Sequence, residues 1–311
     1  MISDRVKRDI KSEWDQNNMA KAGAGILTMF VMFVIFAPII ATSDPASQDL
    51  SRALIPPFQT LEHPLGTDQL GRDMYSRVVY GARISVLVGI LSISAAAMFG
   101  TVVGLVSGFY GGLVDDILMR ITDIIITVPS IMVAVTTFGL IGPLRTTVPD
   151  PFVIVGAAPA DMPSSVVLPG TVIFALAFVS WTTFARIARS EAISVEREGY
   201  VTAARSIGGS NFHIIRSHIL PNSIAPVLVL ATLQVGFAII LESSLAFLGF
   251  SGADYSWGRD IATGRDYLAS AWWVATVPGI MIVLLVIAVN LLGDLLRDSL
   301  DPNIDHGGGN V

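Results

Sequence analysis

Six apolar runs, each long enough to cross a bilayer, constrain the fold of this chain more than any other feature. An α-helix needs roughly 20 apolar residues to cross the hydrocarbon layer. The mean hydropathy of +0.67 over 311 residues, with 14% charged residues, is too apolar for a soluble domain. The sequence therefore predicts an all-α polytopic membrane protein with six transmembrane helices, at about 23–42, 84–108, 117–140, 168–188, 223–248 and 273–295.

The distribution of lysine and arginine predicts how these helices are oriented. Most of the 19 basic residues lie before the first run, in the loop 191–222, or beside run ends on that same side. Because short basic loops stay in the cytoplasm, both termini and this loop are predicted to be cytoplasmic. Residues 1–22 form either a helix in the membrane interface or a frayed tail. Residues 23–298 form the membrane domain and 299–311 a flexible cytoplasmic tail.

The loop 191–222 is the one polar segment in the second half of the chain with a regular pattern. Residues 194–207 have helical spacing, and the Gly208-Gly209 pair is expected to end that helix. Ser210 is a good N-cap for a second short helix, which Pro221 is expected to close. Such a helix, glycine turn and helix could press into a groove of another protein, or be an ordinary solvated hairpin.

This loop resembles the EAA loop of binding-protein-dependent ABC importer permeases. The family pattern is Glu-Ala-Ala, three residues, Gly, nine residues, Ile, any residue and Leu-Pro; Thr202-Ala203-Ala204, Gly208 and Leu220-Pro221 stand at those spacings. Thr202 replaces the glutamate and His218 the isoleucine, so no salt bridge is carried over to position 202. The resemblance implies a loop that couples to an ATPase through Glu198, Tyr200, Thr202, Ala203, Ala204, Arg205, Gly208, Gly209, Phe212, Leu220 and Pro221.

A second stretch, from His63 to Gly89, is similar to one branch of that family. It contains His-Pro-Leu-Gly-Thr-Asp, Gly-Arg-Asp, Ser-Arg and Gly-Ala-Arg in the order seen in the dipeptide, oligopeptide and nickel permeases, and it marks the second permease subunit. The resemblance implies the type I ABC importer permease fold, with its core at 84–298. It leaves dipeptide, oligopeptide, nickel chelate and glutathione open as ligands.

The same resemblance implies partners and a mechanism. The expected partners are a homologous second permease subunit, two ATP-binding-cassette ATPase subunits, an extracytoplasmic substrate-binding protein, a peptide-like ligand and the lipid bilayer. The expected location is the prokaryotic cytoplasmic (inner) membrane. ATP binding to the ATPases would push the loop and switch the pathway between outward-facing and inward-facing states.

Nothing in the sequence predicts chemistry within this chain. A phosphate-binding Gly-Lys-Ser/Thr loop is absent, and the three lysines are Lys7, Lys11 and Lys21. We therefore expect no catalytic residue and no cofactor in this chain, with ATP and Mg on the partner ATPases. The four histidines make no metal-ligand pattern and are expected at the surface, with His213 and His218 on different helix faces. The net charge of −6 and the lack of a basic stripe argue against nucleic acid.

The polar residues of the fifth run leave two interpretations open. Glu242 is either part of a functional site, as an intramembrane carboxylate is by default, or a carboxylate hydrogen-bonded between helices. With Gln234 and Ser243 it is a candidate for the translocation pathway. A gradient-driven transporter or channel is the alternative function, and it would need intramembrane ion sites of this kind.

Several residues predict local structure. Pro129 should kink the third run, and Gly89, Gly100, Gly104 and Gly108 should allow close helix contact in the second. Arg120 and Asp123, three apart, could form an ion pair, and Asp68, Arg72 and Asp73 could pair locally. Trp257, Trp272 and Trp273 fit an interfacial aromatic belt. The segment 141–167 is longer than the family leads us to expect, and its role is not indicated.

Overall fold

The computed structural model describes residues 17–300, so the predictions for 1–16 and 301–311 lie outside the described residues. Its α-helices are α2 Asn18–Ile40, α3 Met74–Tyr110, α4 Gly112–Thr127, α5 Ser130–Ile141, α6 Pro151–Ile154, α7 Gly170–Glu196, α8 Gly199–Ser206, α9 Asn211–Ile214, α10 Leu220–Phe247, α11 Trp257–Gly264 and α12 Trp273–Leu300. Two strands, β1 Arg145–Pro149 and β2 Ser165–Pro169, short 3₁₀ turns at Leu50–Arg52 and Arg265–Tyr267, and a π turn at Ile215–Ile219 complete it.

Six spans are confirmed if α4 and α5 count as one. Five described helices are long and apolar enough to cross a membrane, and α4 with α5 passes the same test as a pair bent by 92°. Val128 and Pro129 form the break, both with extended ψ angles of 129° and 130°. A residue before proline avoids the helical region, so the break is sharper than the predicted kink.

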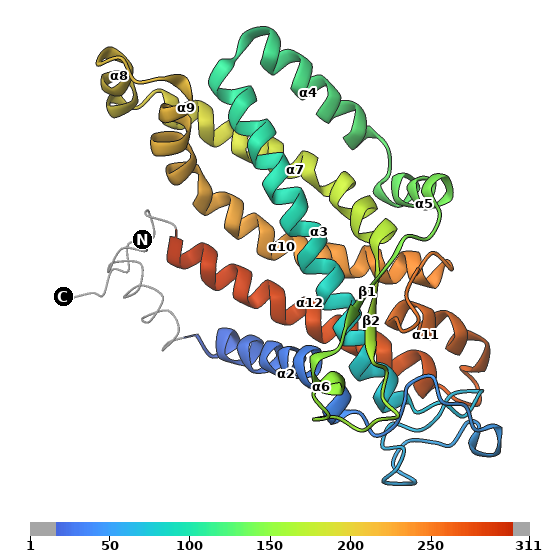
Figure 1. The fold of residues 1–311 in the computed structure, drawn as a ribbon. Helices are drawn as coiled ribbons and strands as arrows, with labels where there is room; N and C mark the ends of the chain where they lie inside the picture. The colour runs from blue at the N-terminus through green and yellow to red at the C-terminus, as the bar shows by residue number, and fades with distance from the viewer. Residues whose placement is uncertain (1–16, 301–311) are drawn as a thin grey trace.

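The helices run between two opposite ends of the molecule (Figure 1). We call the end that carries α8 and α9 the loop end. The other, which we call the hairpin end, carries the segment 41–73, α6 and α11. The long helices therefore separate the connecting segments of the loop end from those of the hairpin end.

The pair α3 and α7 forms the centre of the bundle. A Cβ atom on Gly100 would lie 2.3 Å from the Trp181 carbonyl oxygen, and one on Gly104 would lie 2.3 Å from that of Ala185. Neither position has room for a side chain, so the backbones touch as the glycine spacing predicted. Phe184, which is fully buried, lies in this contact.

The segment 141–167 adds a β-hairpin to the helical fold. Strands β1 and β2 pair antiparallel from Arg145↔Pro169 to Pro149↔Ser165. Asp150 caps α6 by accepting from the Phe152 amide at 3.0 Å, and it is also hydrogen-bonded to Arg83 of α3, with both side chains buried. The Phe152 ring packs on Phe36 of α2, 5.4 Å between centroids. The hairpin therefore ties α2 to α3.

The tryptophans do not form the predicted aromatic belt. Trp257 is fully buried and donates from Nε1 to the Val78 carbonyl at 3.0 Å. Trp273 is 3% exposed and donates to the Thr67 carbonyl at 3.0 Å. Only Trp272, 53% exposed, has the accessibility of an interfacial residue. The indole N–H groups of the other two serve as internal ties because a buried donor needs an acceptor.

The start of α3 is held by a polar network. Arg72 Nε lies 2.6 Å from Asp68 Oδ2, which confirms the predicted local pairing. Asp73 caps α3 at the Ser76 amide, 2.7 Å away, and its other oxygen lies 3.0 Å from His63 Nδ1. His63 is only 9% exposed, so the expectation of a surface residue was wrong here.

Candidate functional site

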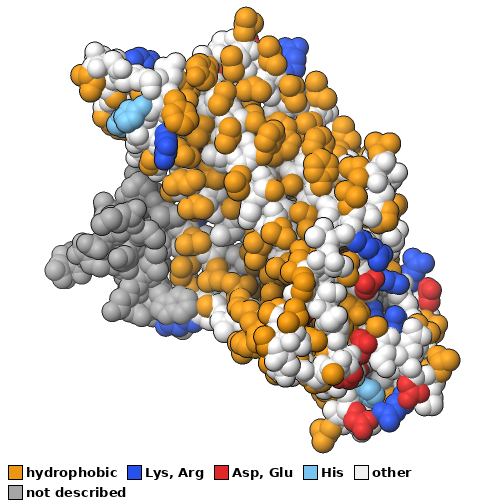
Figure 2. All heavy atoms as spheres, in the orientation of Figure 1, with side chains coloured by type: hydrophobic (Ala, Val, Ile, Leu, Met, Phe, Trp, Pro, Cys, Tyr) orange, Lys and Arg blue, Asp and Glu red, His pale blue; other side chains and the backbone are white. Residues whose placement is uncertain are grey.

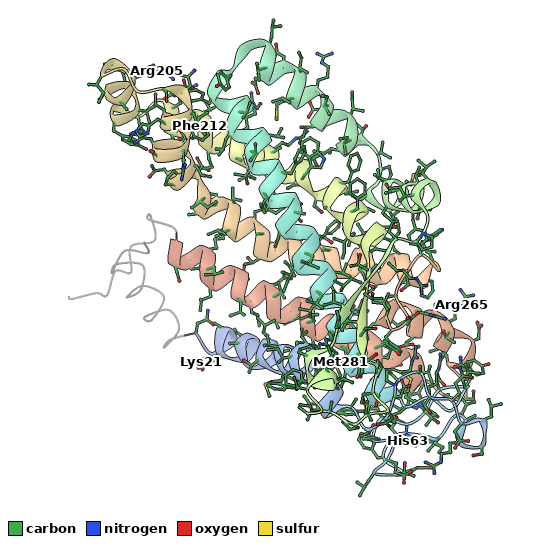
Figure 3. The ribbon with its side chains drawn as sticks, viewed as in Figure 1. Lys21, His63, Arg205, Phe212, Arg265 and Met281 are labelled. Carbon is green, nitrogen blue, oxygen red and sulfur yellow. The ribbon has the colours of Figure 1, made fainter. Side chains whose placement is uncertain are left out.

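The loop after α7 forms a projecting unit at the loop end (Figures 1 and 3). The helix predicted at 194–207 is divided, because α7 continues to Glu196 and α8 begins only at Gly199. Gly208 has a φ of +90°, which favours glycine, and its amide donates to the Arg205 carbonyl at 3.1 Å. The predicted glycine stop is confirmed.

Three large apolar side chains are exposed on this projection among polar ones. Ile207 is 88% exposed, Phe212 72% and Tyr200 44%, whereas Val201 and Ile214 are buried beneath them. Figure 2 shows hydrophobic side chains at this end of the molecule beside basic and histidine side chains. Exposed large apolar residues on a hydrogen-bonded scaffold are typical of a protein docking surface.

Arg205 fixes the projection to the helices behind it. Its guanidinium donates to Glu196 Oε1 at 3.0 Å, which joins α8 to the end of α7. The same group lies 5.5 Å from the centre of the Phe109 ring near the end of α3. Figure 3 shows Arg205 and Phe212 on the projecting unit. Arg205 therefore links α8 to the ends of both α3 and α7.

Pro221 does not close the second short helix, contrary to the prediction. One continuous span extends from Asn211 to Phe247 and comprises α9, the π turn and α10. The Leu220 amide donates to the Ile215 carbonyl, five residues back, and this wider turn precedes the ring of Pro221. Ser210 caps α9 as predicted, accepting from the His213 amide at 3.3 Å.

The π turn also overturns the prediction for two histidines. His213 and His218 were expected on different faces, but their rings lie 5.9 Å apart, nearly perpendicular. A π turn pairs residues five apart, so it brings them together. The Tyr200 ring lies 6.1 Å from His218, which places α8 against this turn.

The other predicted loop residues lie around the same surface. Thr202 and Ala203 are exposed on α8, Ala204 is half-buried, and Glu198 is exposed directly before α8. Gly209 donates its amide to the Ala204 carbonyl at 3.0 Å and has no room for a Cβ there. Leu220, half-buried, and Pro221, exposed, begin α10. The structure thus brings the predicted loop residues to one end of the molecule.

A large apolar groove joins this loop to the spans. It measures about 1630 Å³, and its walls are α3, through residues such as Met98 and Thr101, and α10, through Leu228 and Val235. Phe212 and Pro221 also line it. Sequence reasoning missed this groove, although the exposed side chains at Met98 and Leu228 belong to runs that were predicted to be helical.

Glu242 lies outside that groove and is 1% exposed. Its two oxygens accept from Ser85 Oγ at 2.9 Å and from Ser256 Oγ at 2.9 Å, and Ser243 Oγ lies 3.3 Å away. These contacts join α3, α10 and the residue before α11, which confirms the interpretation as a carboxylate hydrogen-bonded between helices. Ser243 borders a smaller pocket and Gln234 is half-buried. Their part in a translocation pathway stays a prediction.

Within residues 17–300, no group of three or more His, Asp or Glu side chains could hold a metal ion. The loop end presents exposed apolar side chains on a unit that is linked to α3 and α7. The described structure thus combines up to six apolar spans, a groove between α3 and α10, and a loop linked to the ends of α3 and α7.

Comparison with known proteins places this chain in a class and then in a family. The fold is that of a type I ABC importer permease. It matches a chain of the MetNI methionine ABC transporter in an inward-facing conformation with a TM-score of 0.53 at 19% identity, over 73% of this chain and 98% of that one. Residues 100–306 match the binding-protein-dependent transport system inner membrane component, and 14–57 match the N-terminal TM domain of oligopeptide transport permease C. The chain belongs to the family of binding-protein-dependent transport system inner membrane components.

Curated relatives cover nearly the whole chain. The dipeptide transport system permease protein DppC of Alkalihalophilus pseudofirmus is 37% identical over 300 residues, 96% of this chain and 90% of the relative. The probable D,D-dipeptide transport system permease protein DdpC of Escherichia coli is 36% identical over 281 residues, 90% and 86% respectively.

Proposed function

We propose that this chain is one of two different permease subunits of an ABC importer for short peptides, and that it forms the translocation pathway with its homologous partner. The relatives named for dipeptide transport, which it matches along most of its length, support the ligand class. We assign the apolar groove between α3 and α10, about 1630 Å³, to the wall of this pathway. The lipid bilayer of a prokaryotic cytoplasmic membrane is its setting.

The observation that carries the proposal is the exposed apolar end at Ile207 and Phe212. We infer that it docks on one of two ATP-binding-cassette ATPase subunits, which bind ATP and Mg. An extracytoplasmic binding protein delivers the peptide to the hairpin end. ATP then closes the ATPase pair, the loop moves, and α3 and α7 follow through Arg205. The loop end and both chain termini are cytoplasmic in this proposal.

Co-purification tests the docking surface. The tagged chain, purified from native membranes in mild detergent, is expected to bring down an ATPase subunit. Ile207→Asp and Phe212→Asp should abolish this, because a buried unpaired charge at a contact is costly. Leu61→Asp is the matched control, since Leu61 is 98% exposed at the hairpin end. Equal recovery with all variants would show that the ATPase docks elsewhere.

The chain has no cysteine, so single cysteines can test the orientation directly. A membrane-impermeant maleimide applied to intact cells should label Leu61→Cys and not Ile207→Cys. Both positions are exposed within the fold, 98% and 88%, and labelling of Ile207→Cys in inverted vesicles stripped of the ATPase is the control that a docked subunit does not hide it. The reverse labelling would invert the proposed topology.

Uptake into vesicles tests the ligand class and the rival function. Vesicles that hold the complete complex, with binding protein outside and ATP inside, should take up labelled dipeptide. Unlabelled dipeptide should compete better than long oligopeptides, nickel chelate or glutathione. Uptake driven by an ion gradient alone, without ATP, would instead support a gradient-driven transporter.

A further inference from the structure

A second pocket lies between α4 and α7 and has no part in the proposed transport cycle. It measures about 570 Å³, within the range of small-molecule sites. It lies at the loop end, since α4 directly follows the end of α3 where Phe109 meets Arg205. Its lining is charged apart from one methionine: Asp115, Asp116, Met119, Arg120, Asp123, Arg186 and Arg189.

Four of these six charges are already paired across the pocket. Arg189 of α7 binds Asp115 of α4 through two contacts of 2.5 Å, and Ser107 Oγ donates to the same carboxylate at 2.5 Å. Arg186 of α7 donates to Asp123 of α4 at 2.5 Å. These two ion pairs link α4 to α7.

The remaining two charged side chains, Arg120 and Asp116, have no direct partner among the residues described around the pocket, although the Asp116 carboxylate also attracts the nearby Arg189 guanidinium. The sequence predicted an ion pair between Arg120 and Asp123, but Arg186 occupies Asp123 instead. Among the residues that the structure describes, neither Arg120 nor Asp116 makes a hydrogen bond or an ion pair. The two are four apart on α4, so they lie on one side of the helix. They offer the pocket one cationic and one anionic group.

An apolar surface borders this pocket. Along α4, Ile117 is 59% exposed, Ile121 46% and Ile124 62%, beside the face that carries Asp116 and Arg120. Helix α4 is part of the broken span, so this stripe is suited to acyl chains. The pocket thus has a charged lining next to an exposed apolar face of α4. It lies near the end of a span, which is the depth at which lipid headgroups lie.

We propose that this pocket binds a zwitterionic group with a primary ammonium and an anionic oxygen, and that its source is the headgroup of phosphatidylethanolamine. The phosphate accepts hydrogen bonds from the Arg120 guanidinium, and the ammonium donates to the Asp116 carboxylate. The acyl chains lie along the isoleucines of α4. Because the six charges of the lining cancel, the pocket does not favour an anionic lipid, and choline lacks the N–H donors that Asp116 needs.

Lipid titration tests this site without any transport measurement. The full chain, purified with its accompanying subunits and delipidated, is titrated with short-chain phosphatidylethanolamine, phosphatidylcholine and phosphatidylglycerol. Binding is read by native mass spectrometry and by the increase in Tm. We expect phosphatidylethanolamine to bind about tenfold tighter than the other two, since it alone supplies both the phosphate acceptor and the ammonium donor without a net charge.

Two exposed substitutions should remove the preference without disturbing the fold. Arg120→Gln and Asp116→Asn together should reduce phosphatidylethanolamine to the affinity of phosphatidylcholine. Arg265→Gln with Asp266→Asn, an exposed pair at the hairpin end, is the matched control and should keep the preference.

Three outcomes would overturn the proposal. Equal affinity for all three lipids would refute headgroup recognition. A preference that persists in the double variant would place the recognition elsewhere. Displacement of the lipid by free glycylglycine, lost in the same double variant, would assign the pocket to a soluble zwitterion instead of a lipid.

Discussion

Arg77 of α3 and Asp260 of α11 are joined across 183 positions of sequence by a hydrogen bond of 3.0 Å from Nε to Oδ1. The two residues are 2% and 3% exposed, and Arg77 also donates to the Pro45 carbonyl at 3.1 Å. One guanidinium therefore holds three segments of the hairpin end together. None of these contacts could be read from spacing along the chain.

We predict that Asp260→Ala destabilises the protein by about 3–5 kcal/mol, because Arg77 would be left buried without its counterion. Thermal unfolding in detergent measures the loss as a decrease in Tm. Asp266→Ala is the control, since its pair with Arg265 is exposed, and it should cost no more than about 1 kcal/mol. A Tm decrease of equal size in both variants would contradict the importance of the buried pair.

A glycine substitution tests the contact between α3 and α7. Gly104→Ala would place a methyl group 2.3 Å from the Ala185 carbonyl oxygen, so we predict a loss of about 1–3 kcal/mol or more from overpacking. Gly279→Ala in α12 meets no atom within 4 Å and should be neutral or stabilising by up to about 1 kcal/mol. If Gly104→Ala has the higher Tm of the two, the helices do not touch at this position.

The β-hairpin should depend on one carboxylate. Asp150→Ala removes the cap of α6 and leaves Arg83 buried without a partner, so the segment 142–169 should detach from α2 and α3. Limited proteolysis should cleave within this segment much faster than in the unmodified protein. Asp254→Ala, which removes only an exposed pair with Arg145, should leave the cleavage rate unchanged. Equal protection of both variants would mean that strand pairing alone holds the hairpin.

Features that depend on chain-local rules could be predicted from the sequence. The apolar runs predicted the spans, Pro129 predicted a bend in the third of them, and the glycines of α3 predicted its close contact with α7. In each case the residue type itself fixes the outcome, through length, a missing N–H group or a missing side chain.

Features that depend on a distant partner could not be predicted. The sequence places Trp257 in an interfacial belt because it does not show that the indole N–H donates to the Val78 carbonyl. It pairs Asp123 with Arg120, three residues away, whereas in the fold Asp123 binds Arg186 of α7. The π turn before Pro221 has no residue signature, so the contact between His213 and His218 was missed. In each case the actual partner belongs to a segment that comes close only when the chain folds.

The bend of the loop can be tested with two glycines that have the same backbone conformation. Gly208 has φ +90° and Gly249, at the end of α10, has φ +93°, and a Cβ on either would meet nothing within 4 Å. A valine at either position therefore costs only backbone strain, of order 1–3 kcal/mol. The lost stability should be similar in the two variants.

Their effects on transport should differ. Gly208→Val alters the angle between α8 and α9 beside the exposed Ile207 and Phe212, so ATP hydrolysis should continue while dipeptide uptake by reconstituted vesicles decreases at least about tenfold. Gly249→Val lies at the hairpin end and should keep uptake in proportion to hydrolysis. The ratio of peptide imported to ATP hydrolysed is the measurement. Because backbone strain is matched, a ratio that falls equally in both variants would mean that general loosening of the helices, and not the bend at Gly208, uncouples the transporter.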